Sequence, residues 1–297
     1  MSAIIYFQFF LNYIFPLFIF LIGWLGNIFS LIVLSNKELK KIGPKIIYQY
    51  LFIFDSIVLL YVITINLQLA YNLNVAIFYS LICKLYSYFN YPLGVLSPFL
   101  IVYISIDRYI SIKYPARRFF LRKPKIQHIY FWLVFITSHL YYSPAAFFYD
   151  ISSESLSNTT TSSPSCFFDN NESKILVAIM DLAFRVIIPF TMMFVLTGLL
   201  IKSIFESRNR IVENFLAEQN RTFYKEIKLS FSSILVNLIY IFTQFPTTIT
   251  YYYPQYFSND VFVLTTYIFF ANYALNFYIL LFTNSLFREK FLKIFKK

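Results

Sequence analysis

Long apolar segments alternate with short polar ones along nearly the whole chain. A helix needs about 20 apolar residues to cross a bilayer, and seven segments reach that length. They lie near residues 8–34, 46–70, 80–112, 126–148, 174–204, 224–252 and 260–283. The pattern predicts an all-α membrane protein in which one seven-transmembrane helix bundle occupies residues 1–297 as a single domain.

The last stretch, residues 285–297, has a different pattern. Its leucine and phenylalanine side chains fall on one face of a helix, and its lysine and arginine side chains fall on the other. Such a helix lies in the membrane interface rather than across the membrane. We therefore expect a short cytoplasmic amphipathic eighth helix.

Composition agrees with a membrane protein and disfavours an enzyme. Hydrophobic residues make up 59% of the 297 residues and charged residues 13%, which is more apolar surface than a soluble domain of this length can bury. The five glycines do not cluster into a phosphate-binding loop, and the two histidines and two cysteines lack the spacing of a zinc site. We expect no catalysis and no organic cofactor.

The distribution of positive charge predicts the orientation. Apart from Lys84, Lys174 and Arg185, every lysine and arginine falls in the first, third or fifth connection or in the C-terminal tail. Because cytoplasmic loops carry this excess, we expect a plasma-membrane protein with an extracellular N-terminus and a cytoplasmic C-terminus. The net charge of +11 then reflects topology and contact with anionic membrane lipid, and it does not indicate nucleic-acid binding.

The connection between the fourth and fifth spans supports this orientation. It carries two glycosylation sequons, which begin at Asn158 and Asn171. Cys166 lies in the same connection and Cys83 lies at the outer start of the third span. Both cysteines are therefore on the oxidising side, where a disulfide is the default expectation and two buried thiols are the alternative.

The third span ends in Asp107-Arg108-Tyr109, which resembles the Asp-Arg-Tyr signature of rhodopsin-like G-protein-coupled receptors. The 25 residues from Cys83 to Arg108 make about 37 Å of helix, enough to cross the hydrocarbon core. The chain looks like a divergent, invertebrate-type member of this family, with a peptide or chemosensory ligand. Further matches are Gly26-Asn27, Asp55, Trp132, Pro189, Pro246, Asn272, Asn276 and the run 284–291.

This resemblance implies a receptor that transmits the binding of an extracellular peptide or small molecule to a heterotrimeric G protein. It assigns the coupling role to Asp107, Arg108 and Tyr109. Arg108 would pair with Asp107 in the inactive state and face the G protein once the sixth span swings outward. An ordinary interfacial ion pair is the alternative for these two charges.

Asp55 lies in the middle of the second span, where an isolated charge costs roughly 2.5 to 3.5 kcal/mol on insertion scales. Partners inside the bundle are therefore expected, and Asn27, Ser97, Asn272 and Asn276 are the candidates. The resemblance implies that these residues line a cavity for sodium and water. A hydrogen-bonded cluster without an ion is the alternative.

The fifth span carries Asp181 and Arg185 one helical turn apart in its outer half. Either they neutralise each other as a structural pair, or Arg185 binds an anionic group of the ligand while Asp181 orients it. Asn90 stands where amine receptors carry an aspartate, which disfavours a monoamine. The resemblance places further residues around the ligand: Tyr86, Asn90, Gly94, Gln244, Thr247 and Tyr251.

Some positions depart from the family pattern. Phe277 replaces the proline expected after Asn276, and Gln244 replaces the usual tryptophan of the sixth span. Ser230 occupies the place of an acidic partner for Arg108, so we expect that partner to be absent. A receptor-like protein that has lost signalling is one alternative function. A transporter or channel is another, although neither repeats nor a series of pore-lining polar residues support it.

Overall fold

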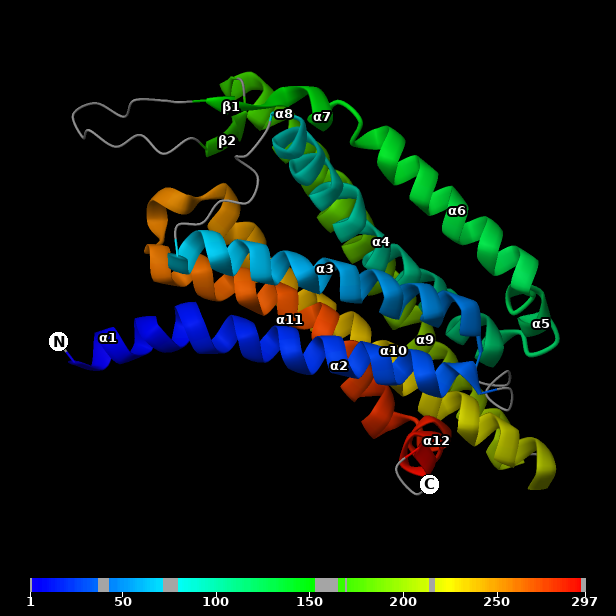
Figure 1. Cartoon of the computed structure of the whole chain (residues 1–297). Helices are drawn as coiled ribbons and strands as arrows, with labels where there is room; N and C mark the ends of the chain where they lie inside the picture. Colours follow the sequence, from blue (N-terminus) through cyan, green and yellow to red (C-terminus); the bar gives the residue numbers. More distant parts are fainter. Residues whose placement is uncertain are drawn as a thin grey trace.

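The computed structural model describes residues 2–36, 43–71, 80–152, 165–168, 170–213 and 217–294. Long helices form one bundle, with the N-terminus and a small hairpin at one end and the C-terminus nearer the other (Figure 1). We call the first the hairpin end. The opposite end, where the third long helix reaches Arg108, is called the Arg108 end.

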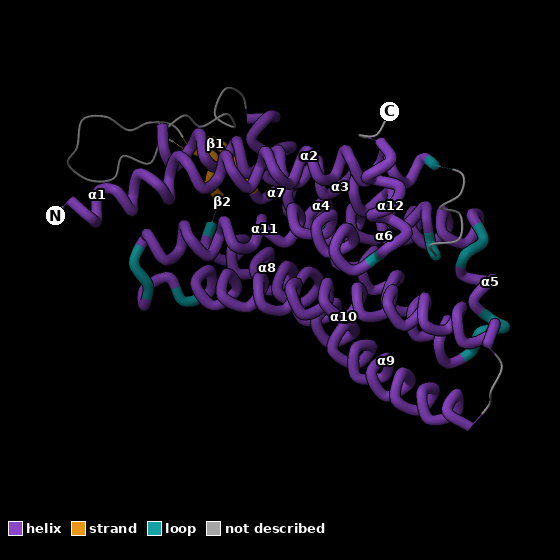
Figure 2. Tube along the Cα trace, turned by 90° about the horizontal axis from the view of Figure 1, so that it is seen from below, coloured by secondary structure: helices purple, strands orange, loops and turns teal. Residues whose placement is uncertain are grey.

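The helices follow one another along the chain with short connections. The first part contains α1 (Ser2–Phe9), η1 (Phe10–Ile14), α2 (Phe15–Ser35), α3 (Lys45–Tyr71), α4 (Ser80–Lys113), α5 (Arg118–Leu121), α6 (Pro124–Tyr141) and α7 (Ala145–Phe148). The second part contains β1 (Tyr149–Ser152), β2 (Ser165–Phe168), α8 (Asn171–Asp181), η4 (Leu182–Ile187), α9 (Ile188–Glu213), α10 (Ala217–Tyr252), η5 (Pro254–Tyr256), α11 (Asn259–Thr283) and α12 (Ser285–Ile294). Figure 2 shows α9 and α10 side by side.

Within the described residues, six helices have the length and hydropathy needed to cross a membrane. They are Tyr6–Ser35, Lys45–Thr64, Leu81–Lys113, Asn171–Glu206, Glu226–Tyr252 and Asn259–Thr283. The 18-residue α6 is not among them, because polar side chains at Lys125, Gln127 and His128 occupy its first turns. It packs against α3 and α4 as the seventh long helix of the bundle.

The fourth long helix is shorter than the apolar pattern predicts. It ends at Tyr141, whereas the predicted span continues to residue 148. Pro144 explains the break, because proline lacks the N–H that an uninterrupted helix would need at that position. The chain then forms α7 and an antiparallel hairpin in which Tyr149 pairs with Phe168 and Ser152 pairs with Ser165.

Two π-helical turns widen long helices near the hairpin end. Such turns shift the usual backbone pairing and allow a carbonyl to accept a bond from a neighbouring helix. In η1 the carbonyl of Asn12 accepts from the Asn66 amide, and in η4 the carbonyl of Arg185 accepts from the Tyr240 hydroxyl at 2.7 Å. The second bond ties α10 to the turn that carries Arg185.

Small residues bring α2 close to α11. A Cβ atom added at Gly23 would lie 2.6 Å from Ala274 Cβ, which is closer than real side chains approach. Close backbone contact of this kind substitutes for the hydrophobic driving force that helices lack inside a membrane. The contact fixes α11, which carries Asn272 and Asn276, against α2.

Candidate functional site

Arg108 lies fully buried near the C-terminal end of α4. Its Nη2 atom lies 3.1 Å from Asp107 Oδ2, and its Nη1 atom lies 3.1 Å from Glu226 Oε2. Glu226 belongs to α10, so the arginine joins two long helices. A buried guanidinium requires such partners, because leaving it unpaired is costly.

The expectation that Arg108 has no acidic partner on the sixth long helix is wrong. Ser230 does not carry a charge, but Glu226 lies one turn before it on the same helical face. The Ser230 hydroxyl donates to the Glu226 carbonyl at 2.8 Å, and the longer glutamate side chain reaches Arg108. A search for a carboxylate four residues earlier would have found it.

Arg122, in the connection after α5, bridges both carboxylates. Its Nε atom lies 3.0 Å from Asp107 Oδ1, and its Nη2 atom lies 3.3 Å from Glu226 Oε2 and 2.7 Å from Ser111 Oγ. Burial opposes its charge, but the two carboxylates outweigh burial and raise the pKa of Arg122. Arg118 Nη1 also approaches Glu226 Oε1, at 3.4 Å. We call these residues the charge cluster: Asp107, Arg108, Arg118, Arg122 and Glu226.

The first connection covers the charge cluster with a glycine. Gly43 has φ of +116°, and a Cβ atom there would lie 1.9 Å from Arg108 Nη2. Only glycine combines that backbone conformation with room for the guanidinium. The sequence contained no signal for this contact, because it joins a loop to a residue of a different helix.

Gln127 links the same connections. Its Oε1 atom accepts from the backbone N–H groups of Ile46 and Ile47, at 2.9 and 3.3 Å, in the first turn of α3. Its Nε2 atom donates to the Arg122 carbonyl at 2.9 Å. The amide therefore satisfies helix-end donors of α3 and holds the backbone of Arg122 in place. Tyr109 lies outside this arrangement and packs edge-on against Tyr114.

A second polar group lies deep in the bundle around Asp55. Asn276 Nδ2 donates to Asp55 Oδ2 at 2.8 Å, and Asn27 Nδ2 donates to the Tyr273 carbonyl at 3.3 Å. The Ser97 hydroxyl lies close to the same carboxylate. We call the five buried side chains the polar cluster: Asn27, Asp55, Ser97, Asn272 and Asn276.

Oxygen atoms without hydrogen-bond partners distinguish the polar cluster from a closed network. Among the described residues they include Asn27 Oδ1, Asp55 Oδ1, Ser97 Oγ, Asn272 Oδ1 and Asn276 Oδ1. Buried polar atoms normally have a partner, so such a group indicates room for water or an ion. Carboxylate, amide and hydroxyl oxygens are the ligands that hard cations prefer, so the residues fit sodium.

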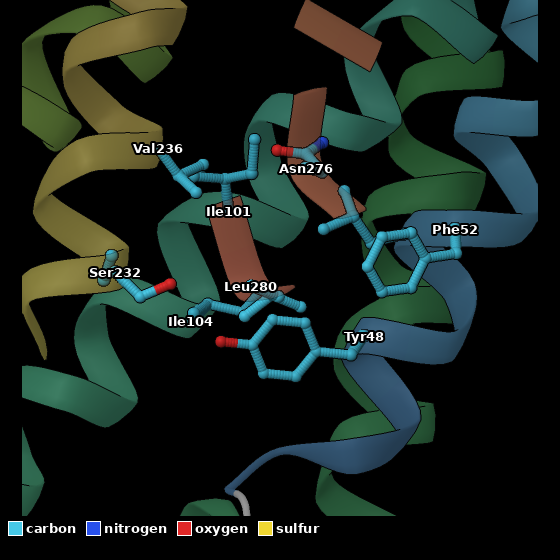
Figure 3. Close-up of a pocket in the computed structure, with 10 residues that line it drawn as sticks. Tyr48, Phe52, Ile101, Ile104, Ser232, Val236, Asn276 and Leu280 are labelled. Carbon is cyan, nitrogen blue, oxygen red and sulfur yellow. The ribbon is translucent and has the colours of Figure 1, made fainter. Parts of the chain in front are cut away.

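A small cavity lies between the polar cluster and the charge cluster. Figure 3 shows Asn276 at one side of it and Tyr48 at the other, with apolar side chains between them. Tyr48 lies within electrostatic reach of Arg108. The apolar walls, which include Phe52, Ile101 and Leu280, separate the two polar groups. A conformational change that brings the polar cluster into contact with the charge cluster must therefore move these apolar side chains.

Near the hairpin end, Arg185 reaches into the bundle. Its Nη2 atom bonds Asp181 Oδ2, and Tyr142 donates its hydroxyl to Asp181 Oδ1 at 3.1 Å. The guanidinium lies over the Phe269 ring, 5.5 Å from its centre, and a Cβ at Gly94 would be 3.2 Å from Nη1. The arginine therefore extends from the fifth long helix toward α4 and α11.

Comparison with protein families agrees with this arrangement. The chain matches the family model described as 7 transmembrane receptor (rhodopsin family) over residues 26–284. It belongs to that family. The receptor is therefore a multi-pass membrane protein of a family whose members are generally not enzymes. A comparison with curated proteins gives no match.

The receptor brings only some of the predicted ligand residues together. Gly94 lies against Arg185, whereas Tyr86 bonds Thr64 at 2.6 Å and Thr247 donates to the Thr265 carbonyl at 2.7 Å. Gln244 is buried, and its Nε2 has no hydrogen-bond partner among the described residues. Asn90 is half-buried, and Tyr251 is exposed.

Three residues near Arg185 were missed from the sequence. Tyr142 follows the last residue of α6, Tyr240 lies in α10 and Phe269 lies in α11, and they approach the Asp181–Arg185 turn only in the folded receptor. Each is an aromatic residue in a chain with 26 tyrosines and 38 phenylalanines, so its type alone carries no signal.

The cysteines and sequons are described in part. Cys83 is disulfide-bonded, and the side chain of Cys166, the other cysteine, lies outside the described residues. Asn158 also lies outside them. Asn171 is exposed at the first residue of α8, next to Asn170, which caps that helix by accepting from the Ser173 N–H at 2.7 Å.

Proposed function

We propose that the receptor transmits binding of an extracellular ligand at the hairpin end to a heterotrimeric G protein at the Arg108 end. The ligand is a neuropeptide-like or chemosensory molecule. The receptor lies in the plasma membrane with its N-terminus outside. The lysines and arginines concentrated in the connections of the Arg108 end support this orientation.

The observation that carries this proposal is the ion pair between buried Arg108 and Glu226. It joins α4 to α10 through charged groups, which a movement of α10 away from α4 would separate. Arg108 would then present a planar fork of N–H donors to a cytoplasmic partner. Such a contact suits a cytoplasmic face with two arrangements. In the closed one α10 contacts α4 through this ion pair, and in the open one α10 has moved away.

A G-protein dissociation sensor in cells tests coupling. Peptide and odorant libraries are screened against the receptor, against Arg108→Ala and against the control Arg288→Ala, which removes an exposed arginine. We expect Arg108→Ala to abolish ligand-induced dissociation at unchanged surface expression, while Arg288→Ala still responds. A wild-type response from Arg108→Ala would contradict the mechanism. Substrate uptake or membrane current without G-protein dissociation would favour a transporter or channel.

The proposed ligand carries an anionic group that Arg185 binds. Asp181 is the one hydrogen-bond partner of the Arg185 side chain among the described residues, although a guanidinium has five N–H donors. The side chain retains 19% exposure. Aromatic rings and the open face of Gly94 surround it, which suits a carboxylate attached to an apolar group.

Paired substitutions separate this role from a structural one. Asp181→Asn with Arg185→Gln leaves no lone charge, so a purely structural pair predicts that the double variant recovers binding lost by each single variant. Anion capture instead predicts a folded double variant that does not bind. Amidating a carboxylate-bearing agonist should then weaken wild-type binding and leave Arg185→Gln unaffected. If amidation weakened binding equally in the wild type and in Arg185→Gln, the Asp181–Arg185 pair would have only a structural role.

We assign a sodium ion and water to the polar cluster as part of the same proposal. The support is the set of buried oxygens without partners around Asp55. Sodium would supply the positive charge that a carboxylate in the middle of a span otherwise lacks. The alternative, water alone, leaves the receptor insensitive to the identity of the monovalent cation.

A further inference from the structure

The short helix α5 turns two aromatic side chains outward at the Arg108 end. Phe119 is 64% exposed and Phe120 is 57% exposed. Large apolar side chains are rarely left together in water, so adjacent exposed rings indicate a surface that another molecule covers. In Figure 1, α5 lies at the edge of the bundle beside the start of α6.

The neighbours of these rings fix their outward direction. Leu121 packs against the buried core, and its carbonyl accepts from the Tyr103 hydroxyl at 2.5 Å. Arg122 is held by the carboxylates of the charge cluster. Because these two residues point inward from one short turn, Phe119 and Phe120 face away from the bundle.

Positive charges surround the same rings. Arg118 lies over the Phe119 ring at 5.0 Å and Lys123 lies over the Phe120 ring at 5.8 Å. Arg117 lies over the ring of neighbouring Tyr114 at 5.6 Å. Residues 114–125 contain no aspartate or glutamate. Arg117, Lys123 and Lys125 are exposed and form no ion pair within the described part of the chain. Their charge is available to an anionic partner.

The surface continues onto the exposed side of α6. After Lys125 and His128, the same face carries exposed apolar side chains at helical spacing: Ile129, Trp132, Leu133, Ile136 and Leu140. In a membrane-spanning receptor this face meets acyl chains. Cations therefore stand at headgroup level directly beside a lipid-facing surface, which favours lipid over a protein partner.

We propose that α5 and the start of α6 form a binding site for anionic phospholipid. Phe119 and Phe120 insert among the acyl chains of the inner leaflet, while Arg117, Lys123 and Lys125 bind phosphate and carboxylate groups of the headgroups. The assignment to the inner leaflet rests on the proposed orientation, whereas lipid binding itself does not depend on signalling. Nanodiscs expose both leaflets, so their use separates this proposal from that orientation.

Lipid retention tests the cationic part. The purified receptor is reconstituted in nanodiscs of equal phosphatidylcholine and phosphatidylserine, and retained lipids are counted by native mass spectrometry. Each cation near an anionic membrane surface strengthens binding by about fivefold. Arg117→Gln/Lys123→Gln/Lys125→Gln should therefore lose phosphatidylserine selectivity. The control Lys202→Gln/Lys228→Gln/Arg288→Gln removes the same charge elsewhere and should keep it. Equal losses in both triple variants would overturn the site.

Spin labelling tests insertion of the rings. A nitroxide on Phe120→Cys should be accessible to oxygen and protected from a water-soluble nickel complex in nanodiscs, whereas a nitroxide on Ala116→Cys in the same connection should show the reverse. Nickel access to the Phe120→Cys label would overturn the proposal. Protection that arises only after a G protein is added would also overturn it, because the surface would then belong to a protein partner.

Discussion

Glu226 Oε2 lies 3.1 Å from Arg108 Nη1 and connects α10 to α4 across 118 residues of sequence. Asp107 and Arg122 complete the contact, so each buried charge faces an opposite one. Moving α10 outward would separate Glu226 from its arginine partners at once. The charge cluster therefore joins α10 to α4 at the Arg108 end.

Glu226→Gln should raise basal activity. The amide keeps the size of the side chain but loses the charge-assisted bond to Arg108, worth about 2 kcal/mol, so the closed arrangement should lose roughly thirtyfold in population ratio. Basal nucleotide exchange on a co-reconstituted G protein measures this. Glu206→Gln is the control, because Glu206 pairs with Lys113 at a half-exposed site and should have little effect. Unchanged basal exchange in Glu226→Gln would contradict the role of the cluster.

Gly43→Ala should lower thermal stability. The new methyl group would collide with Arg108 Nη2, and a φ of +116° is strained for any residue with a Cβ. Strain of this kind costs about 1 to 3 kcal/mol, which should lower Tm by several degrees.

The matched control is Gly198→Ala in α9. A Cβ there meets no atom within 4 Å, and alanine favours a helix more than glycine does, so its Tm should be equal or higher. Unfolding of the purified receptors followed by a thiol-independent dye compares the two. Equal Tm values for both variants would show that the first connection does not cover Arg108 tightly.

The sequence was most informative about elements that repeat a simple physical pattern. Apolar segments of spanning length predicted the helical bundle, and the amphipathic stretch predicted α12. The break at Pro144 was misjudged because the apolar pattern continues past it to Phe148. Hydropathy measures compatibility with lipid, whereas the missing N–H of proline decides where the helix ends.

The sites were less predictable than the bundle. Asp55 could be singled out because charge in an apolar span is costly, and Asp107 and Arg108 could be singled out by their resemblance to the Asp-Arg-Tyr signature of the family. Glu226 was missed because it lies one turn away from Ser230, the position at which the family pattern places the acidic partner. Gly43 could not be found at all, because its role depends on how a loop folds back over another helix.

Tyr240→Phe should weaken ligand binding more than it weakens folding. The hydroxyl donates to the Arg185 carbonyl inside the π-helical turn, so its loss leaves that carbonyl unsatisfied and frees the turn to repack. A cost of about 1 to 2 kcal/mol corresponds to roughly tenfold weaker binding. Tyr278→Phe is the control, since it removes a bond to the Ile22 carbonyl of similar geometry in another part of the bundle. Equal affinity losses in both would reject a special role for the turn.

Asp55→Asn should abolish a sodium effect on stability. An ion that binds only the folded receptor raises its stability by about 2.7 kcal/mol at a hundredfold excess over Kd, so the wild-type Tm should be higher in sodium chloride than in choline chloride at equal ionic strength. Asn removes the carboxylate charge while keeping the shape and an oxygen that accepts from Asn276 Nδ2, so the variant should have the same Tm in both salts. The control Asp260→Asn, which removes a carboxylate near Gln8 at the hairpin end, should keep the wild-type difference. A sodium-dependent Tm in Asp55→Asn would place the ion elsewhere. Equal wild-type Tm values in the two salts would indicate that the polar cluster binds water and no sodium ion.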